Sequence, residues 1–168
     1  MKKIFLLNLC AFFLFVFSSC GVSAPQKPVT NFSATMQVNM DNQQVTGEFS
    51  NTYQGVMTFS VTCPDTLKGF SYVYKDSKLQ LSFENINCDT TCEYLPENNY
   101  LNRLYACLHS LGKEENYSCV SSDETEACYK VSVENIDFNI YTNSITGIIN
   151  KIETDGVEIV FTKQKAFN

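Results

Sequence analysis

Strict alternation of apolar and polar side chains runs through most of this chain and limits what it can fold into. From residue 32 to residue 40 every even-numbered residue is apolar and every residue between is polar. The same period of two returns at residues 57–61, 70–83, 129–140 and 157–161. Neighbouring side chains of a strand point to opposite faces, so this pattern predicts strands that bury one face only. Asp155-Gly156 is a strong hairpin signal between two of them.

One segment in the middle departs from this pattern and predicts a helix. Pro96 suits the first turn of a helix, and Gly112 is placed as its C-terminal cap. Apolar residues at helical spacing lie between them, namely Leu101, Leu104, Tyr105, Leu108 and Leu111. The polar, acidic residues 113–127 predict a loop. We therefore expect an α+β fold, mainly β: a curved antiparallel sheet of about nine strands, an incomplete barrel, wrapped on one main helix.

The first twenty residues have the features of a bacterial lipoprotein signal. Lys2 and Lys3 precede an apolar stretch over residues 4–17, which is too short to span a bilayer but suits a secretory signal. Phe17-Ser18-Ser19-Cys20 resembles the lipobox, which is cut just before a cysteine that carries lipid. Val22-Ser23-Ala24 is an alternative site for ordinary signal peptidase. We predict a signal peptide over 1–19, a lipidated, palmitate-bearing Cys20 with a linker over 20–30, and one domain over 31–168. The location is then the extracytoplasmic face of a bacterial membrane.

Six cysteines remain in the exported part of the chain: Cys63, Cys88, Cys92, Cys107, Cys119 and Cys128. An even number in an exported domain predicts three disulfides, with 15 connectivities open. Metal binding is the weaker interpretation, because no second closely spaced pair follows Cys88 and Cys92 and His109 is the only histidine. We therefore expect disulfides that staple the domain, no metal and no cofactor.

The charge of the chain argues against nucleic acid as a partner. Removal of residues 1–19 leaves 10 basic and 18 acidic residues, a net charge of −8. Such a domain is repelled by phosphates. We expect a monomer held at the membrane by its lipid anchor.

Two resemblances follow from these features. A lipobox, a one-faced antiparallel sheet and a mid-chain helix together resemble the lipoprotein-carrier fold, a half-barrel shared by the periplasmic lipoprotein carrier and related lipid-handling proteins. More narrowly, Cys63-Pro64-Asp65-x-Leu67-x-Gly69-Phe70, followed by Tyr74 and by Leu79-x-Leu81-x-Phe83, is similar to a segment of uncharacterised lipoproteins from clostridial bacteria. The clostridial resemblance implies a cell with one membrane, where holding or sensing a ligand makes more sense than shuttling it.

No catalytic constellation is visible in the sequence. His109 lies one position off the apolar stripe of the helix, which is typical of a partly exposed histidine, and no nucleophile-elbow motif is present. The acidic run at residues 123–126 lacks the ligand spacing of a calcium loop. We therefore predict a protein that is not an enzyme and rank an envelope hydrolase last.

The aromatic residues of the strands carry the functional hypothesis. An ordinary core between sheet and helix is one interpretation of them. The other is that a single helix leaves part of the sheet uncovered, so that the concave face binds a hydrophobic or lipid-like ligand. The residues predicted to line that site are Phe59, Phe70, Tyr72, Leu81, Leu104, Leu108, Val131, Phe138 and Ile159. The alternative function is a protein-interaction or structural module of the cell envelope.

Overall fold

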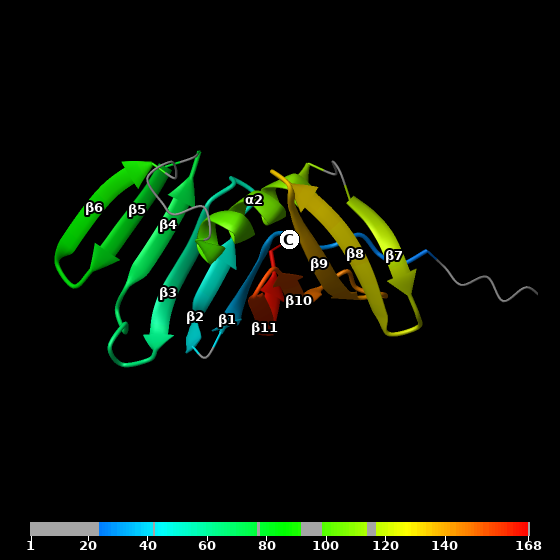
Figure 1. Cartoon of the computed structure of the whole chain (residues 1–168), viewed down its shortest axis with the longest axis horizontal. Coiled ribbons are helices and arrows are strands. Elements are labelled where there is room, and N and C mark those ends of the chain that lie inside the picture. The colour runs from blue at the N-terminus through cyan, green and yellow to red at the C-terminus, as the bar shows by residue number, and fades with distance from the viewer. Residues whose placement is uncertain (1–23, 42, 77, 92–98, 114–116, 168) are drawn as a thin grey trace, which may run out of the picture.

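The computed structural model describes residues 24–41, 43–76, 78–91, 99–113 and 117–167, and within them the chain forms one open sheet (Figure 1). All its pairings are antiparallel, in the order β6-β5-β4-β3-β2-β1-β11-β10-β9-β8-β7. The strands are β1 (Phe32–Met40), β2 (Gln43–Asn51), β3 (Met57–Cys63), β4 (Ser71–Lys75), β5 (Lys78–Phe83), β6 (Ile86–Thr91), β7 (Tyr117–Ser122), β8 (Glu126–Val133), β9 (Ile136–Asn143), β10 (Ile149–Thr154) and β11 (Val157–Ala166).

Two meanders make up the sheet, and the first and last strands join them. β1 pairs with β2 on one side and with β11 on the other, so residues from opposite ends of the chain meet at its centre. Here Met36 lies opposite Phe161 and Val38 opposite Ile159. The rings of Phe32, Phe49 and Phe161 contact one another with centroids 5.2–5.4 Å apart. The alternation in the sequence therefore places its apolar members on one shared inner face.

The helix α2 (Tyr100–Gly112) lies over the middle of that face (Figure 1) and contacts β8. Asn99 caps it, because its side-chain oxygen accepts hydrogen bonds from the backbone N–H groups of Leu101 (3.0 Å) and Asn102 (3.1 Å). Its buried residues form the predicted stripe, with Cys107 added: Leu101, Leu104, Cys107, Leu108 and Leu111. The predicted start near Pro96 lies outside the described residues. None of the helices in the described ranges has the length and hydrophobicity to cross a membrane.

The predicted fold class is wrong in its sheet. The structure is mainly β, with a single short helix among the described residues and an open sheet of eleven strands, rather than an incomplete barrel of roughly nine. The two strands that the pattern does not predict are β6 and β7, at the two edges. Their alternation is short, Ile86-Asn87-Cys88 in β6 and Tyr117-Ser118-Cys119 in β7, because neither strand buries a full face. The predicted loop over 113–127 contains β7, a turn and the start of β8.

The predicted disulfide staples are also wrong. The described cysteines are all free thiols, namely Cys63, Cys88, Cys107, Cys119 and Cys128, while Cys92 lies outside the described residues. Cys107 is fully buried among the apolar side chains of the core, and Cys63 and Cys88 lie on strands separated by two others. Across β7 and β8, Cys119 lies opposite Tyr129 rather than opposite Cys128. The fold is therefore held by its core and its strand pairing.

Candidate functional site

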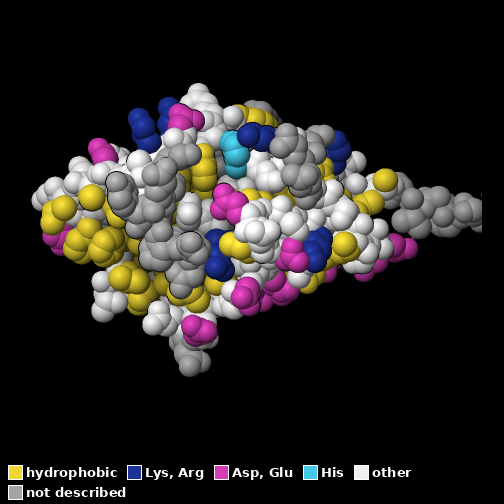
Figure 2. All heavy atoms as spheres, turned by 45° about the horizontal axis from the view of Figure 1, so that its top comes forward, with side chains coloured by type: hydrophobic (Ala, Val, Ile, Leu, Met, Phe, Trp, Pro, Cys, Tyr) yellow, Lys and Arg dark blue, Asp and Glu magenta, His cyan; other side chains and the backbone are white. Residues whose placement is uncertain are grey.

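The inner face of β4, β5 and β6 is apolar and only partly covered. Tyr72, Leu81 and Cys88 lie in one row across the three strands, and Phe83 and Ile86 lie in the next. The ring of Phe70 stacks on that of Phe83, with centroids 4.3 Å apart and planes at 17°. We call these six residues the apolar end: Phe70, Tyr72, Leu81, Phe83, Ile86 and Cys88. Figure 2 shows apolar side chains gathered at this end of the molecule.

The apolar end differs from the middle of the same face in its exposure. Tyr74 and Leu79, one step along β4 and β5, are 0% and 1% exposed, because the core closes over them. Tyr72, Leu81 and Phe83 keep part of their surface accessible, and Ile86 is 70% exposed. Isolated exposed apolar residues are ordinary, but a connected group on one face is typical of a binding surface.

The nine residues predicted to line a ligand site separate into two groups. Six of them are buried core residues with at most 2% of their surface exposed: Phe59, Leu104, Leu108, Val131, Phe138 and Ile159. The other three, Phe70, Tyr72 and Leu81, come together in the apolar end. Phe83 could have been found from its alternation with Leu79 and Leu81. Ile86 and Cys88 alternate with Asn87 and Asp89 over too few residues to predict a strand.

Two tyrosine hydroxyls lie at the apolar end, that of Tyr72, which belongs to it, and that of Tyr100, which is beside Tyr72. Burial raises the pKa of Tyr72, and burial together with the nearby Tyr72 raises the pKa of Tyr100 at the start of α2. Both side chains are therefore neutral at physiological pH and can donate a hydrogen bond. The site offers apolar contacts with a neutral polar border, which suits an amphiphile more than an ion.

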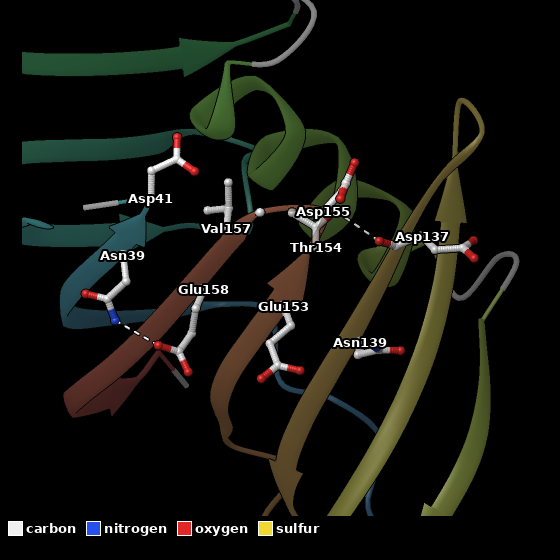
Figure 3. Close-up of a pocket in the computed structure, with 10 residues that line it drawn as sticks. Asn39, Asp41, Asp137, Asn139, Glu153, Thr154, Asp155, Val157 and Glu158 are labelled. Carbon is white, nitrogen blue, oxygen red and sulfur yellow. Dashed lines mark hydrogen bonds between the residues drawn. The ribbon is translucent and has the colours of Figure 1, made fainter. Parts of the chain in front are cut away.

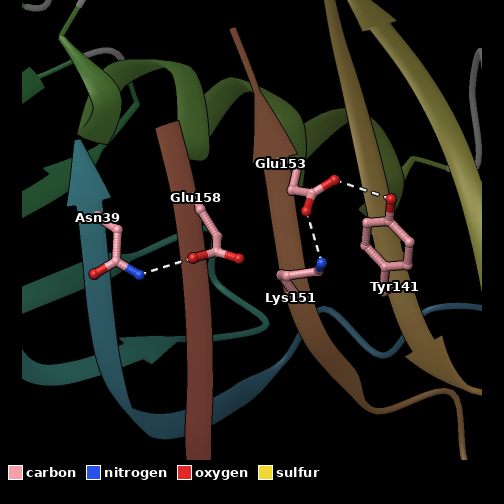
Figure 4. Close-up of polar contacts among 5 residues, drawn as sticks. All are labelled: Asn39, Tyr141, Lys151, Glu153 and Glu158. Atoms are coloured by element: carbon pink, nitrogen blue, oxygen red, sulfur yellow. Dashed lines mark hydrogen bonds and ion pairs between the residues drawn. The ribbon is translucent and has the colours of Figure 1, made fainter. Parts of the chain in front are cut away.

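The opposite face of the sheet is polar, and several of its charged side chains are hydrogen-bonded. Asn39 on β1 donates a hydrogen bond to Glu158 on β11 (2.8 Å). The carboxylate of Glu153 on β10 accepts hydrogen bonds from the ammonium group of Lys151 (2.6 Å) and from the hydroxyl of Tyr141 (2.9 Å) (Figure 4). The hydrogen bond from Lys151 holds the pKa of Glu153 below its usual range. This network is typical of a solvated, hydrogen-bonded strand face.

A shallow hollow at the ends of these strands gathers several carboxylates (Figure 3). Its lining includes Asp41, Asp137, Asp155 and Glu158. Lys130 neutralises Asp137 across an ion pair of 2.7 Å. Within the described ranges no three acidic, histidine or cysteine side chains converge as metal ligands. The hollow therefore lacks the geometry of a cation site.

Among the described residues, Cys107, Cys128 and His109 do not form a reactive group. Burial raises the pKa of Cys107 and of Cys128, so both thiols are protonated at neutral pH. His109 is exposed, and its ring stacks on Tyr105 with centroids 5.8 Å apart. Asp123, in the acidic run, accepts the backbone N–H groups of Thr125 (2.7 Å) and Glu126 (2.8 Å), so it shapes the turn between β7 and β8.

Residues 26–29, in the predicted linker, lie against the far end of the domain. The backbone N–H of Gln26 donates to the carbonyl of Ser144 (2.9 Å), and that of Val29 donates to the carbonyl of Gly147 (2.8 Å). The hydroxyl of Tyr129 donates to the carbonyl of Gln26 (2.9 Å). These contacts fix the chain beside β8 and the β9–β10 turn, at the end of the sheet opposite β6 (Figure 1).

Comparison with known proteins identifies a shared fold but no family. No family model matches the chain, and no curated protein matches it. An uncharacterised conserved protein from Thermus thermophilus resembles it with a TM-score of 0.53 and 8% identity, over 83% of this chain and 80% of that one. At this identity the likeness shows the fold alone.

Looser likenesses carry names from the lipoprotein-carrier group. They include the LolA superfamily protein NE2245 from Nitrosomonas europaea (TM-score 0.41, 8% identity, 84% of this chain and 88% of that one). A putative outer membrane lipoprotein-sorting protein domain from Vibrio parahaemolyticus is a second (TM-score 0.45, 7% identity, 81% and 85%). Scores below 0.5 are too low to support a functional argument.

Proposed function

We propose that the protein is a membrane-anchored extracytoplasmic lipoprotein that binds a hydrophobic or lipid-like ligand, without catalysing a reaction. The apolar end is the observation that carries this proposal, since it is a connected, partly exposed apolar surface on the inner face of the sheet. It contains no Asp, Glu, Lys, Arg or His, and it offers the neutral hydroxyls of Tyr72 within it and of Tyr100 beside it. An acyl chain with a small polar head group matches this combination of surfaces.

The size of the surface sets the affinity that we expect. Burial of a methylene group contributes about 0.8 kcal/mol, so a chain of about ten methylenes gains at most ~8 kcal/mol. Association and the ordering of the ligand offset part of that gain. A dissociation constant from about 1 μM to about 1 mM follows, which suits a protein that takes up and releases its ligand.

The attached N-terminal segment supports a defined orientation for an anchored protein. If Cys20 carries lipid, Gln26 is only six residues away, and six residues span at most about 20 Å. The β7–β10 end would then stand close to the membrane. The apolar end lies at the opposite end of the sheet, so a ligand would reach it from the aqueous side.

Ligand uptake tests the proposal. The full-length chain, solubilised in a detergent with a low tendency to bind proteins, is titrated with a fatty acid that carries a fluorescent label. We expect saturable uptake that falls at least tenfold in Phe83→Asp. Ser82→Asp is the matched control, because Ser82 is the next residue of β5 and points to the other face. Circular dichroism checks that both variants fold.

Either of two results would overturn the proposal. One is an absence of saturable uptake by the unmodified chain. The other is an equal loss of uptake in both variants, since uptake would then not depend on the inner face. Each would leave the envelope interaction module as the better interpretation.

A further inference from the structure

Among the strands of the described ranges, β6 lies at one edge of the sheet, where it can accept a further strand. It pairs with β5 in regular register over all six residues, from Lys78 opposite Thr91 to Phe83 opposite Ile86. An edge strand presents backbone N–H and C=O groups that have no partner strand, and proteins usually protect such edges with bulges, prolines or charged side chains, lysine above all. β6 contains no bulge, no proline and no lysine, and its one charged residue is Asp89.

The other edge of the sheet is protected. The pairing of β7 with β8 shifts register between Cys119 and Ser121, which leaves Val120 outside the ladder. Such a bulge bends the strand and interrupts the row of backbone groups that a partner would need. Of the two edges, β6 is therefore the one suited to pairing.

A second copy of β6 fits this edge in one register. For a two-fold axis normal to the sheet, the strands run antiparallel and the inner faces of both copies stay on the same side. With Cys88 opposite its counterpart, Ile86 lies opposite Thr90, and Asn87 lies opposite Asp89. Five residues of each strand then pair, and each carboxylate faces an amide that can donate a hydrogen bond.

The neighbouring symmetric registers are worse. A shift in one direction places Asp89 opposite its own copy, and like charges directly across a strand pair repel. A shift in the other direction centres the pair on Asn87 and leaves only three residues of each β6 paired. The repulsion between like charges and the number of paired residues thus both favour the register centred on Cys88.

We propose that two copies of this protein associate through β6, with Cys88 of each copy at the two-fold axis. The pairing covers Ile86, which is 70% exposed in one copy. It also joins the two apolar ends into one longer concave surface. Residues 26–29 lie at the other end of each sheet, so a membrane anchor leaves β6 accessible. The proposal replaces the monomer expected from the sequence and does not depend on ligand binding.

Oxidative cross-linking tests the contact. Facing residues of an antiparallel pair have Cα atoms about 4.5–5.5 Å apart, within reach of a disulfide. The full-length chain is reconstituted in phosphatidylcholine vesicles and treated briefly with copper phenanthroline. In a background with Cys63→Ser and Cys119→Ser, which removes two other exposed thiols, we expect a covalent dimer. Addition of Cys88→Ser should abolish it.

The charge pattern gives a second, sign-specific readout. Asn87→Asp places a carboxylate opposite Asp89 of the other copy, and the two-fold axis repeats this contact at a second place in the dimer. The dissociation constant of the dimer, measured by sedimentation in density-matched detergent, should therefore rise about tenfold. Asn87→Lys places an ammonium opposite Asp89 and should leave the dimer as strong or stronger. Asn87 is exposed, so neither variant disturbs the core. A chain that sediments as a monomer, a cross-link that survives Cys88→Ser, or equal weakening by both substitutions would overturn the proposal.

Discussion

The backbone carbonyl oxygen of Lys27 lies only 2.1 Å from the position that a β-carbon on Gly147 would occupy. Gly147 has a φ of +70°, and its own carbonyl receives the N–H of Val29. The β9–β10 turn can therefore hold the N-terminal segment only while residue 147 lacks a side chain. The segment nearest the predicted lipid anchor is fixed by this close contact.

Gly147→Ala should destabilise the protein by about 2–4 kcal/mol. Part of this loss is the cost of about 1–2 kcal/mol for a β-carbon at positive φ, and the remainder is the displacement of Lys27. Gly156→Ala separates the two contributions, because Gly156 has the same φ of +70° but no atom within 4 Å of its β-carbon position. Denaturant unfolding measures both variants. Equal losses would show that the contact with Lys27 contributes nothing.

Tyr129→Phe should loosen the same segment with a smaller loss of stability. Tyr129 is 3% exposed, and its hydroxyl donates to the carbonyl of Gln26. A lost hydrogen bond of this kind costs about 0.5–1.5 kcal/mol. We expect faster amide hydrogen exchange at Gln26 and Val29. Tyr53→Phe is the control. The hydroxyl of Tyr53 donates a hydrogen bond to the carbonyl of Phe167 (2.8 Å), but its side chain is 67% exposed. A loss of stability in Tyr53→Phe equal to that in Tyr129→Phe would contradict the prediction.

The strands that bury one face could be predicted from the sequence, and the edges could not. Alternation from residue 32 to residue 40 matches β1, because the apolar side chains there face the core. The edge strands β6 and β7 lie at the rim, where burial imposes no period on the sequence. Edge strands are specified by backbone pairing, which leaves a weak signal in side chains.

Only part of the candidate site could be predicted, and the reason is related. Phe59 and Tyr72 alternate equally well in their strands, yet Phe59 is fully buried and Tyr72 is partly exposed. The difference depends on where α2 lies across the sheet, which is a tertiary property. Periodicity identifies the face that is apolar, but it does not identify which part of that face remains open.

The ion pair of Lys151 and Glu153 should make stability depend on pH at the acid end. Lys151 holds the pKa of Glu153 below its ordinary value of 4.5, so the unfolded chain binds this proton more readily than the folded chain. The contribution is therefore complete above pH 4.5 and is lost as the pH falls through the folded pKa. The pKa of Lys151 is raised from 10.5, chiefly by the same hydrogen bond, so its contribution is complete below pH 10.5 and is lost as the pH rises through its folded pKa.

Glu153→Gln should flatten the acid limb of the stability profile. Both side chains are about a third exposed, so we expect a loss of only about 0.3–1 kcal/mol at pH 7. Lys151→Met should cause a similar loss, and the double variant should show that the two effects are not additive. The coupling should shrink as the pH falls through the folded pKa of Glu153. A coupling that persists unchanged when Glu153 is protonated would contradict this account.

Leu81→Ala and Leu104→Ala should separate ligand binding from folding. Leu104 on α2 is 1% exposed, and its truncation leaves a cavity, so we expect a loss of about 2–5 kcal/mol in stability. Leu81 belongs to the apolar end and is partly exposed. Its truncation removes contact area that a ligand would bury, so uptake of the labelled fatty acid should fall several-fold while stability changes by less than about 1.5 kcal/mol. Uptake is measured without denaturant, at a temperature where both variants are folded. If Leu104→Ala reduced uptake and Leu81→Ala did not, the ligand would occupy the space beneath α2, and the apolar end would not be the binding site.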